Sequence, residues 1–200
     1  LRQTQAAELN NFSNLLDRSL ESFQSQINNL ALNDFVVNSL VDFSTHDTYL
    51  PIFFRSLRLS GAENTSIIYT DFSGEVITGK DTALLEEKQR YFEWKKTVLE
   101  YSQPYFKFTE HGVFTAAPIF YANSAEAALA AYVPNLQSLF GGEFASEDLM
   151  LVVTGEGFVV FSNQPTVLAS GAMFETEAFN DSFIAQVDFG KVTLYSLKPT

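Results

Sequence analysis

The chain has 200 residues, no cysteine, and a formal net charge of −12 that arises from 12 basic and 24 acidic side chains. This charge argues against a protein that binds nucleic acid or an anionic membrane surface, because affinity for phosphate depends on Lys and Arg. The lack of cysteine excludes disulfides, thiolate chemistry and cysteine-ligated zinc. With 46% hydrophobic residues and 20 Phe, the composition predicts packed cores rather than global disorder.

A long helical pattern covers roughly the first 40 residues, with no Gly or Pro before Pro51. Two interpretations stay open: a core helix of the chain itself, or a stalk-like helix whose early part packs against a second copy of the chain. A helix of this length would span about 60 Å, more than one small domain needs to cover itself, and this favours the stalk. The apolar side chains form one narrow stripe of Phe12, Leu16, Leu20, Phe23, Ile27 and Leu30.

A shorter helix and a hairpin are predicted next. The helix covers about residues 48–59, with Pro51 in its first turn and Gly61 as its C-terminal stop. The stretch SIIYTDFSGEVITG (66–79) reads as two apolar strands around a tight turn, in which Asp71 leads and Gly74 closes. The turn residues therefore have a structural role rather than a functional one.

Further strands follow a helical stretch. Asp81 or Thr82 caps a helix that runs to about residue 101, and alternating aromatic residues then flank a hairpin turn at 110–112. The segment EAALAAYVPN (126–135) is rich in Ala, which favours helix, but its position after two strands of a meander predicts a third strand. Residues 135–140 are expected to form a short helix.

The pattern restarts after Gly141 and Gly142. LMLVVTGEGFVVFSN (149–163) repeats the strand, turn and strand arrangement, and two closing strands are predicted at 182–188 and 191–197. We therefore expect an α+β fold in which a long N-terminal helix precedes two antiparallel sheets, the second of them reduced. The expected parts are residues 1–60 for the helices, 61–141 for a first module and 142–200 for a smaller second module.

No catalytic or metal-binding motif is present. His46 and His111 are isolated, the Gly155–Gly157 stretch is too short for a dinucleotide loop, and carboxylate pairs such as Glu175 and Glu177 arise by chance in an acidic chain. The sequence therefore predicts a fragment that is not an enzyme and that holds no cofactor and no metal.

The order of elements resembles the extracytoplasmic PAS-like sensor domains called Cache or PDC domains, and the restart at Leu149 resembles their double form. The resemblance implies that residues 61–141 form a membrane-distal PAS-like module and residues 142–200 a smaller membrane-proximal one. The most specific part of the resemblance lies in residues 92–120, where the family shows a Trp, a Ser-x-Pro-Tyr stretch and an apolar strand that leads to a Pro. The matching residues are Trp94, Ser102, Pro104, Tyr105 and Ala117-Pro118-Ile119.

The resemblance implies a periplasmic sensor that is part of a histidine kinase, a GGDEF diguanylate cyclase or a chemoreceptor, and that dimerises through its long helix. The chain begins at Leu1 rather than Met and has no run of ~20 apolar residues, so we expect a piece of a longer protein whose membrane spans lie outside it. An alternative stays open: a protein-interaction module that reads a periplasmic solute-binding protein and has no small-molecule pocket of its own.

The resemblance also indicates where a small ligand would bind, under the helical loop of the first sheet. In the amino-acid-binding branch an Arg precedes the Trp by two residues, an aromatic residue follows it, and an Asp ends the last meander strand. Phe92, Lys95 and Tyr132 occupy these places, which argues against an amino-acid ligand. We expect instead an aromatic box for a small organic anion or an aromatic metabolite, although each aromatic residue could instead be core. The expected residues are Tyr69, Arg90, Tyr91, Trp94, Tyr105 and Tyr132.

Overall fold

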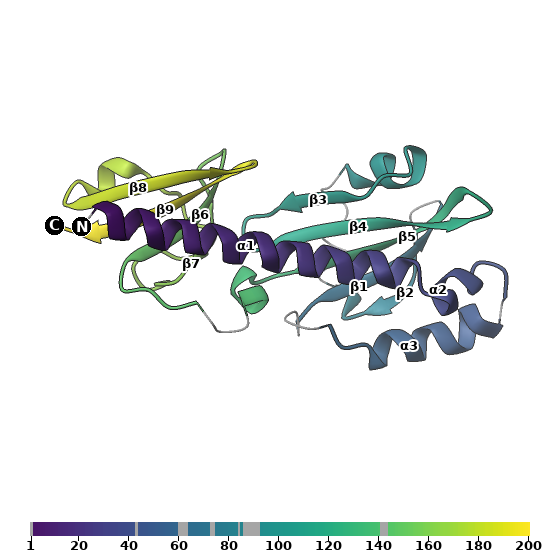
Figure 1. The fold of residues 1–200 in the computed structure, drawn as a ribbon. Coiled ribbons are helices and arrows are strands. Elements are labelled where there is room, and N and C mark those ends of the chain that lie inside the picture. Colours follow the sequence, from purple (N-terminus) through teal and green to yellow (C-terminus); the bar gives the residue numbers. More distant parts are fainter. Residues whose placement is uncertain are drawn as a thin grey trace. The chain divides into compact units, whose positions relative to one another are not determined.

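The computed structural model describes residues 2–42, 44–59, 64–72, 75–83, 85, 93–140 and 144–200. In these residues a long helix is followed by two antiparallel sheets, one of five strands and one of four (Figure 1). The predicted α+β fold with a reduced second sheet is therefore confirmed. Four glycines predicted at turns or boundaries, Gly61, Gly74, Gly141 and Gly142, lie outside the described residues.

Helix α1 (Arg2–Ala31) is shorter than the roughly 40 residues that the apolar pattern predicts. The chain leaves the helix at Asn33, whose backbone is extended with φ −62° and ψ 129°. The Asn33 side chain accepts a hydrogen bond of 2.9 Å from Phe35 N and so caps a second helix, α2 (Asp34–Asn38). A side chain that caps locally offers the backbone an alternative to helix continuation, and this ends α1.

The apolar stripe of α1 is buried inside the chain's own structure. Phe12 is fully buried, and its ring lies 4.6 Å from that of Phe144 and 5.7 Å from those of Phe140 and Phe161. The prediction that the early part of this stripe packs against a second copy is therefore wrong, because these side chains already have partners within the chain. The buried stripe consists of Leu9, Phe12, Leu16, Leu20, Phe23, Ile27 and Leu30.

The chain divides into two compact units, each of which is described by itself. The five-stranded unit contains residues Ser22–Lys107 and Phe114–Val133. The four-stranded unit contains Leu1–Glu21, Phe108–Val113 and Pro134–Thr200. Residues of α1 therefore contribute to the core of both units.

The sheet of the five-stranded unit has the strand order β2-β1-β5-β4-β3. Strand β1, next to the edge strand β2, pairs antiparallel with both β2 and β5, with Ile68 opposite Gly79 on one side and Ala130 on the other. The Ala-rich segment is strand β5, as predicted, because a place between two strands outweighs the helix preference of Ala. The strands are β1 (Ser66–Asp71), β2 (Val76–Lys80), β3 (Tyr105–Phe108), β4 (Val113–Tyr121) and β5 (Ser124–Val133).

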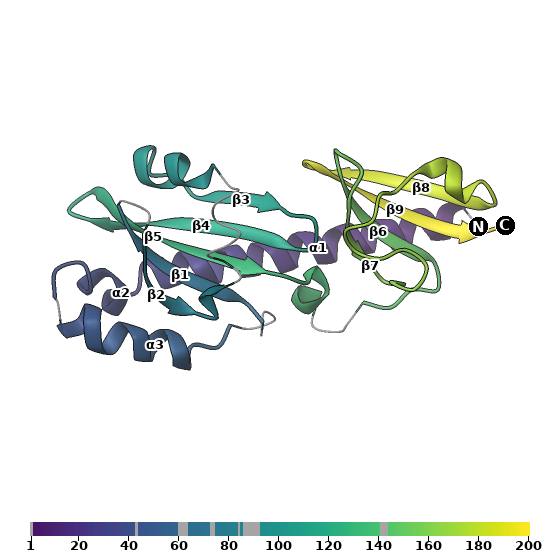
Figure 2. The same ribbon diagram turned by 180° about the vertical axis from the view of Figure 1, so that it is seen from behind.

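Different segments cover the two faces of this sheet. One face carries an apolar cluster that includes Trp94, Val98 and Leu99, from the segment that ends in the π-helix η2 (Lys96–Glu100). Beyond α2 follow the π-helix η1 (Thr45–Tyr49) and helix α3 (Leu50–Ser56), with Pro51 in its first turn as predicted. Figures 1 and 2 show α3 beside β1 and β2.

The four-stranded unit has the strand order β7-β6-β9-β8. Gln5 is buried on α1 and donates its Nε2 hydrogens to Phe183 O and Ser196 O, both at 2.8 Å. These bonds hold the start of α1 against the last two strands, so the two ends of the chain lie side by side (Figure 1). The elements are η3 (Leu136–Phe140), β6 (Leu149–Thr154), β7 (Val159–Ser162), η4 (Thr176–Phe179), β8 (Ser182–Phe189) and β9 (Val192–Pro199).

Candidate ligand-binding site

The residues that the sequence predicts for a ligand site are only partly brought together. Trp94, Tyr105 and Tyr132 share one apolar cluster on the sheet of the five-stranded unit. Tyr69 lies on the opposite face of the sheet, because its neighbour Ile68 belongs to the cluster and successive strand residues point to opposite faces. The remaining two candidates, Arg90 and Tyr91, lie outside the described residues.

Trp94 is the centre of the cluster and is fully buried. Its ring lies 5.9 Å from that of Phe114, which in turn lies 5.9 Å from the ring of Tyr105. Three Ala residues of β4 and β5, at positions 116, 128 and 130, form the sheet surface of this cluster. Because an Ala side chain ends at Cβ, this surface leaves room for the large rings above it.

Two buried polar atoms of the described residues have no hydrogen-bond partner, and both belong to this face. One is Trp94 Nε1, and the other is Thr70 Oγ1. Thr70 is paired directly with Ala128, a member of the Trp94 cluster, so its side chain points to the same face. A buried polar group without a partner costs about 1–3 kcal/mol and usually marks a bound water or ligand. This face therefore lacks a hydrogen-bond acceptor for the indole and a partner for the hydroxyl.

Sequence reasoning missed Thr70. It stands in SIIYTD, a strand buried on both faces, where no alternation of polar and apolar residues marks it. The available signal was a hydroxyl residue within an otherwise apolar strand, which by itself is common in β-structure.

Replacing Thr70 by Val is expected to raise the free energy of unfolding of the ligand-free chain by about 1–3 kcal/mol, because it removes a buried hydroxyl that has no partner. Thr115→Val is the matched control. Thr115 is buried in the same sheet, but its Oγ1 donates to Tyr105 O at 3.0 Å, so the same change should lower stability by a similar amount. Urea unfolding of the two variants measures both effects. Loss of stability in both variants would show that Thr70 has a partner in solution.

Tyr105 presents a neutral phenol at this face. Burial raises the pKa of Tyr105, and the negative charge of Glu93 raises it further. The hydroxyl therefore keeps its proton at neutral pH and acts as a hydrogen-bond donor as well as an acceptor.

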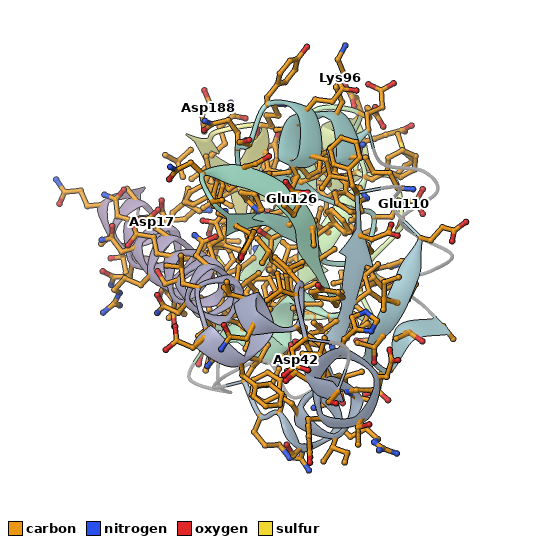
Figure 3. The ribbon with its side chains drawn as sticks, turned by 90° about the vertical axis from the view of Figure 1, so that its right-hand side faces the viewer. Asp17, Asp42, Lys96, Glu110, Glu126 and Asp188 are labelled. Atoms are coloured by element: carbon orange, nitrogen blue, oxygen red, sulfur yellow. The ribbon has the colours of Figure 1, made fainter. Side chains whose placement is uncertain are left out.

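A cavity of about 390 Å³ lies on the other face of the same sheet. Tyr69 lies at the buried end of this cavity. Burial raises the pKa of Tyr69, and the negative charge of Asp71 raises it further. The hydrogen bond with Ser39 acts in the opposite direction and lowers the pKa. Figure 3 labels two residues of the lining, Asp42 in the segment after α2 and Glu126 on β5. The Glu126 side chain points to the Trp94 face, because it has the same strand parity as Ala128. The lining residues are Ser39, Leu40, Val41, Asp42, His46, Tyr69, Asp71, Ile77, Tyr121 and Glu126.

Neither face offers a metal centre within the described ranges, since no group of three His, Cys, Asp or Glu residues there is placed to hold a metal ion. In the same part of the chain, no helix combines the length and the apolar character that crossing a bilayer requires.

Solved structures of sensor domains share this arrangement over nearly the whole chain. The sensor domain of the V. cholerae histidine kinase DctB aligns with a TM-score of 0.65 and 14% identity, over 98% of this chain and 99% of that one. The ligand-binding domain of the Campylobacter jejuni chemoreceptor Tlp3, in complex with 4-methylisoleucine, aligns with a TM-score of 0.64 and 11% identity, over 98% and 92%. The chain has the fold of these sensor domains. The resemblance to double Cache domains that the sequence indicates is thus confirmed at the level of the fold.

Another similar structure is an extracellular ligand binding receptor from Desulfohalobium retbaense, with a TM-score of 0.55 and 10% identity. The alignment covers 92% of this chain but only 39% of the receptor. The sequence itself matches no description of a known protein family and no curated protein. The similarity of this chain to the sensor domains therefore rests on the fold alone.

Proposed function

We propose that the chain is the periplasmic sensory domain of a membrane-bound receptor, a histidine kinase or a diguanylate cyclase, and that it binds a small ligand without catalysing a reaction. The fold supports the proposal, because it is shared with the sensor domain of a histidine kinase and with the ligand-binding domain of a chemoreceptor. In this proposal the membrane spans belong to segments outside the chain.

The observation that carries the proposal is the pair of unpartnered polar atoms on the Trp94 face. A ligand with a hydrogen-bond acceptor satisfies Trp94 Nε1, and a second polar group on it satisfies Thr70 Oγ1. Tyr105 and Tyr132 then provide apolar ring surface for the body of the ligand. A mostly apolar site with a few placed polar groups is the usual form of a small-molecule pocket. Arg90 and Tyr91 stay sequence-based candidates for the same site.

The bonding of Gln5 supports a route for the signal. Its side chain joins α1 to both β8 and β9, so a displacement of these strands also displaces the start of the helix. A ligand biases such a displacement only through a difference in its affinity for two arrangements of the domain. In our proposal this displacement passes into the flanking membrane segments.

Dimerisation through α1 also remains part of the proposal, but on a different face from the buried stripe. Many of the exposed residues of the helix have small or amide side chains, for example Ala7, Asn10, Asn14 and Ser25. Side chains of this size allow two helices to approach each other.

A thermal-shift screen with small carboxylates, amines and aromatic metabolites tests for the ligand. A compound that binds should stabilise the chain by about 2.7 kcal/mol at one hundred times its Kd. Since Trp94 is the only Trp, its fluorescence provides an independent titration signal. Trp94→Phe and Thr70→Val should each weaken binding about tenfold, because each leaves a polar group of the ligand unpaired.

Tyr101→Phe is the control variant, because Tyr101 lies in the same covering segment but is 59% exposed. It should bind the ligand as the unmodified chain does. If no compound stabilises the chain and a purified periplasmic solute-binding protein binds it instead, the small-ligand proposal fails and the interaction-module alternative takes its place.

A further inference from the structure

The cavity on the Tyr69 face is separate from the proposed ligand site. Tyr69 and Asp71 of β1 line it, whereas Ile68 and Thr70 of the same strand point to the Trp94 face. A β-bulge helps to form it: the β1–β2 register shifts between Tyr69 and Thr70, so that Ile77 on β2 has no directly paired residue. A bulge re-aims a side chain, and Ile77 is the β2 residue that lines the cavity.

The lining combines negative charge with ring and apolar surface. Two carboxylates, those of Asp42 and Asp71, come from two different segments, and neither Lys nor Arg is among the lining residues that the structure describes. Rings of Tyr69, Tyr121 and His46 and apolar groups of Leu40, Val41 and Ile77 complete the walls.

Neighbouring groups hold the Asp42 carboxylate in place and favour its ionised form. Its carboxylate accepts hydrogen bonds of 2.9 Å from Thr45 Oγ1 and from Ser44 N. The hydrogen bonds from Thr45 lower the pKa of Asp42. The cavity therefore contains a fixed negative charge at neutral pH.

The hydroxyl of Tyr69 has hydrogen-bonding capacity left over. Tyr69 is only 2% exposed, and its hydroxyl lies 3.3 Å from Ser39 Oγ. The Ser39 hydroxyl has one hydrogen, and Val36 O accepts it at the shorter distance of 2.5 Å. The phenol oxygen of Tyr69 therefore accepts at most one long hydrogen bond, from Ser39, and keeps further hydrogen-bonding capacity toward the cavity.

We propose that this cavity binds a small organic ammonium ion. Carboxylates, a phenol oxygen and ring faces are the groups that recognise such a cation, through charge-assisted hydrogen bonds and cation–π contacts. The apolar part of the lining contacts the carbon skeleton, which a bare metal ion does not have. The volume of about 390 Å³ lies within the range of small-molecule sites. The inference does not depend on the ligand proposed for the Trp94 face.

Isothermal titration calorimetry of the 200-residue chain with putrescine, a small diamine, tests the inference. Putrescine should bind, whereas succinate, which has a carbon chain of the same length and the opposite charge, should not bind at this site. Asp42→Asn should weaken putrescine binding about 5- to 10-fold, because it removes a charge from the lining without changing its shape.

Two control variants separate this site from other effects. Glu156→Gln changes the net charge by the same amount, but Glu156 lies in the exposed turn after β6. The affinity of this variant for putrescine should therefore stay within about twofold of that of the unmodified chain. Trp94→Phe should leave putrescine binding unchanged. The inference is overturned if putrescine gives no binding, if Asp42→Asn binds putrescine as well as the unmodified chain does, or if Trp94→Phe abolishes binding. The last result would assign the amine to the Trp94 face and would leave the proposed sensory function standing.

Discussion

Replacing Phe12 by Ala is expected to lower the free energy of unfolding by about 3–5 kcal/mol, the usual loss for a buried aromatic residue. Phe12 is fully buried and contacts the rings of Phe140, Phe144 and Phe161 in the four-stranded unit. The variant loses the area that the ring buries and leaves a cavity among three aromatic side chains. Guanidinium unfolding followed by circular dichroism measures the change.

Asn11→Ala is the matched control, because Asn11 neighbours Phe12 on α1 but is exposed. Its stability should change by less than about 0.5 kcal/mol. The result also decides between the two interpretations of the apolar stripe. If Phe12→Ala kept full stability and only reduced the mass of an oligomer, the stripe would face a second copy and the buried arrangement would be wrong.

The strands could be predicted because their signals are local. Alternating residues and turn chemistry give the hairpin of β6 and β7 directly, and the position of the Ala-rich segment after two strands gives β5. What covers the α1 stripe could not be predicted in the same way. A helix buries the same stripe whether its partner is a sheet of its own chain or a second copy, so the sequence pattern is identical in the two cases.

The candidate site could be predicted in part, for a similar reason. Trp94, Tyr105 and Tyr132 form one cluster, as the sequence suggests, but Tyr69 lies on the other face. The strand SIIYTD is buried on both faces. Its composition therefore does not show which of its alternate residues point to which face of the sheet. Only the pairing of Ile68 with Ala130 and of Thr70 with Ala128 assigns the faces. The bulge at Ile77, which helps to form the second cavity, leaves no local sequence signal either.

Gly79 is the position where one added methyl group should have a large effect. An added Cβ would overlap Ile67 O on β1 and would lie 2.6 Å from Thr82 Cγ2 and 3.0 Å from Ile68 Cα. Two of these atoms belong to the backbone of β1 and cannot move aside without breaking the β1–β2 pairing. Only Gly therefore allows β2 to lie this close to β1 at this point.

Gly79→Ala is accordingly expected to lower the free energy of unfolding by at least about 3 kcal/mol, at the upper end of overpacking effects. A disturbed β1–β2 pairing should loosen the cluster that buries Trp94, because Ile68 of β1 and Val76 of β2 pack in it. The fluorescence emission of this only Trp should therefore shift to longer wavelength in the native state. Gly155→Ala is the control, because a Cβ there meets only Lys191 O at an ordinary 3.8 Å. It should change neither stability nor emission. Unchanged emission of the Gly79→Ala variant would contradict this expectation. It would mean that the cluster around Trp94 keeps its packing without the native pairing of β1 and β2.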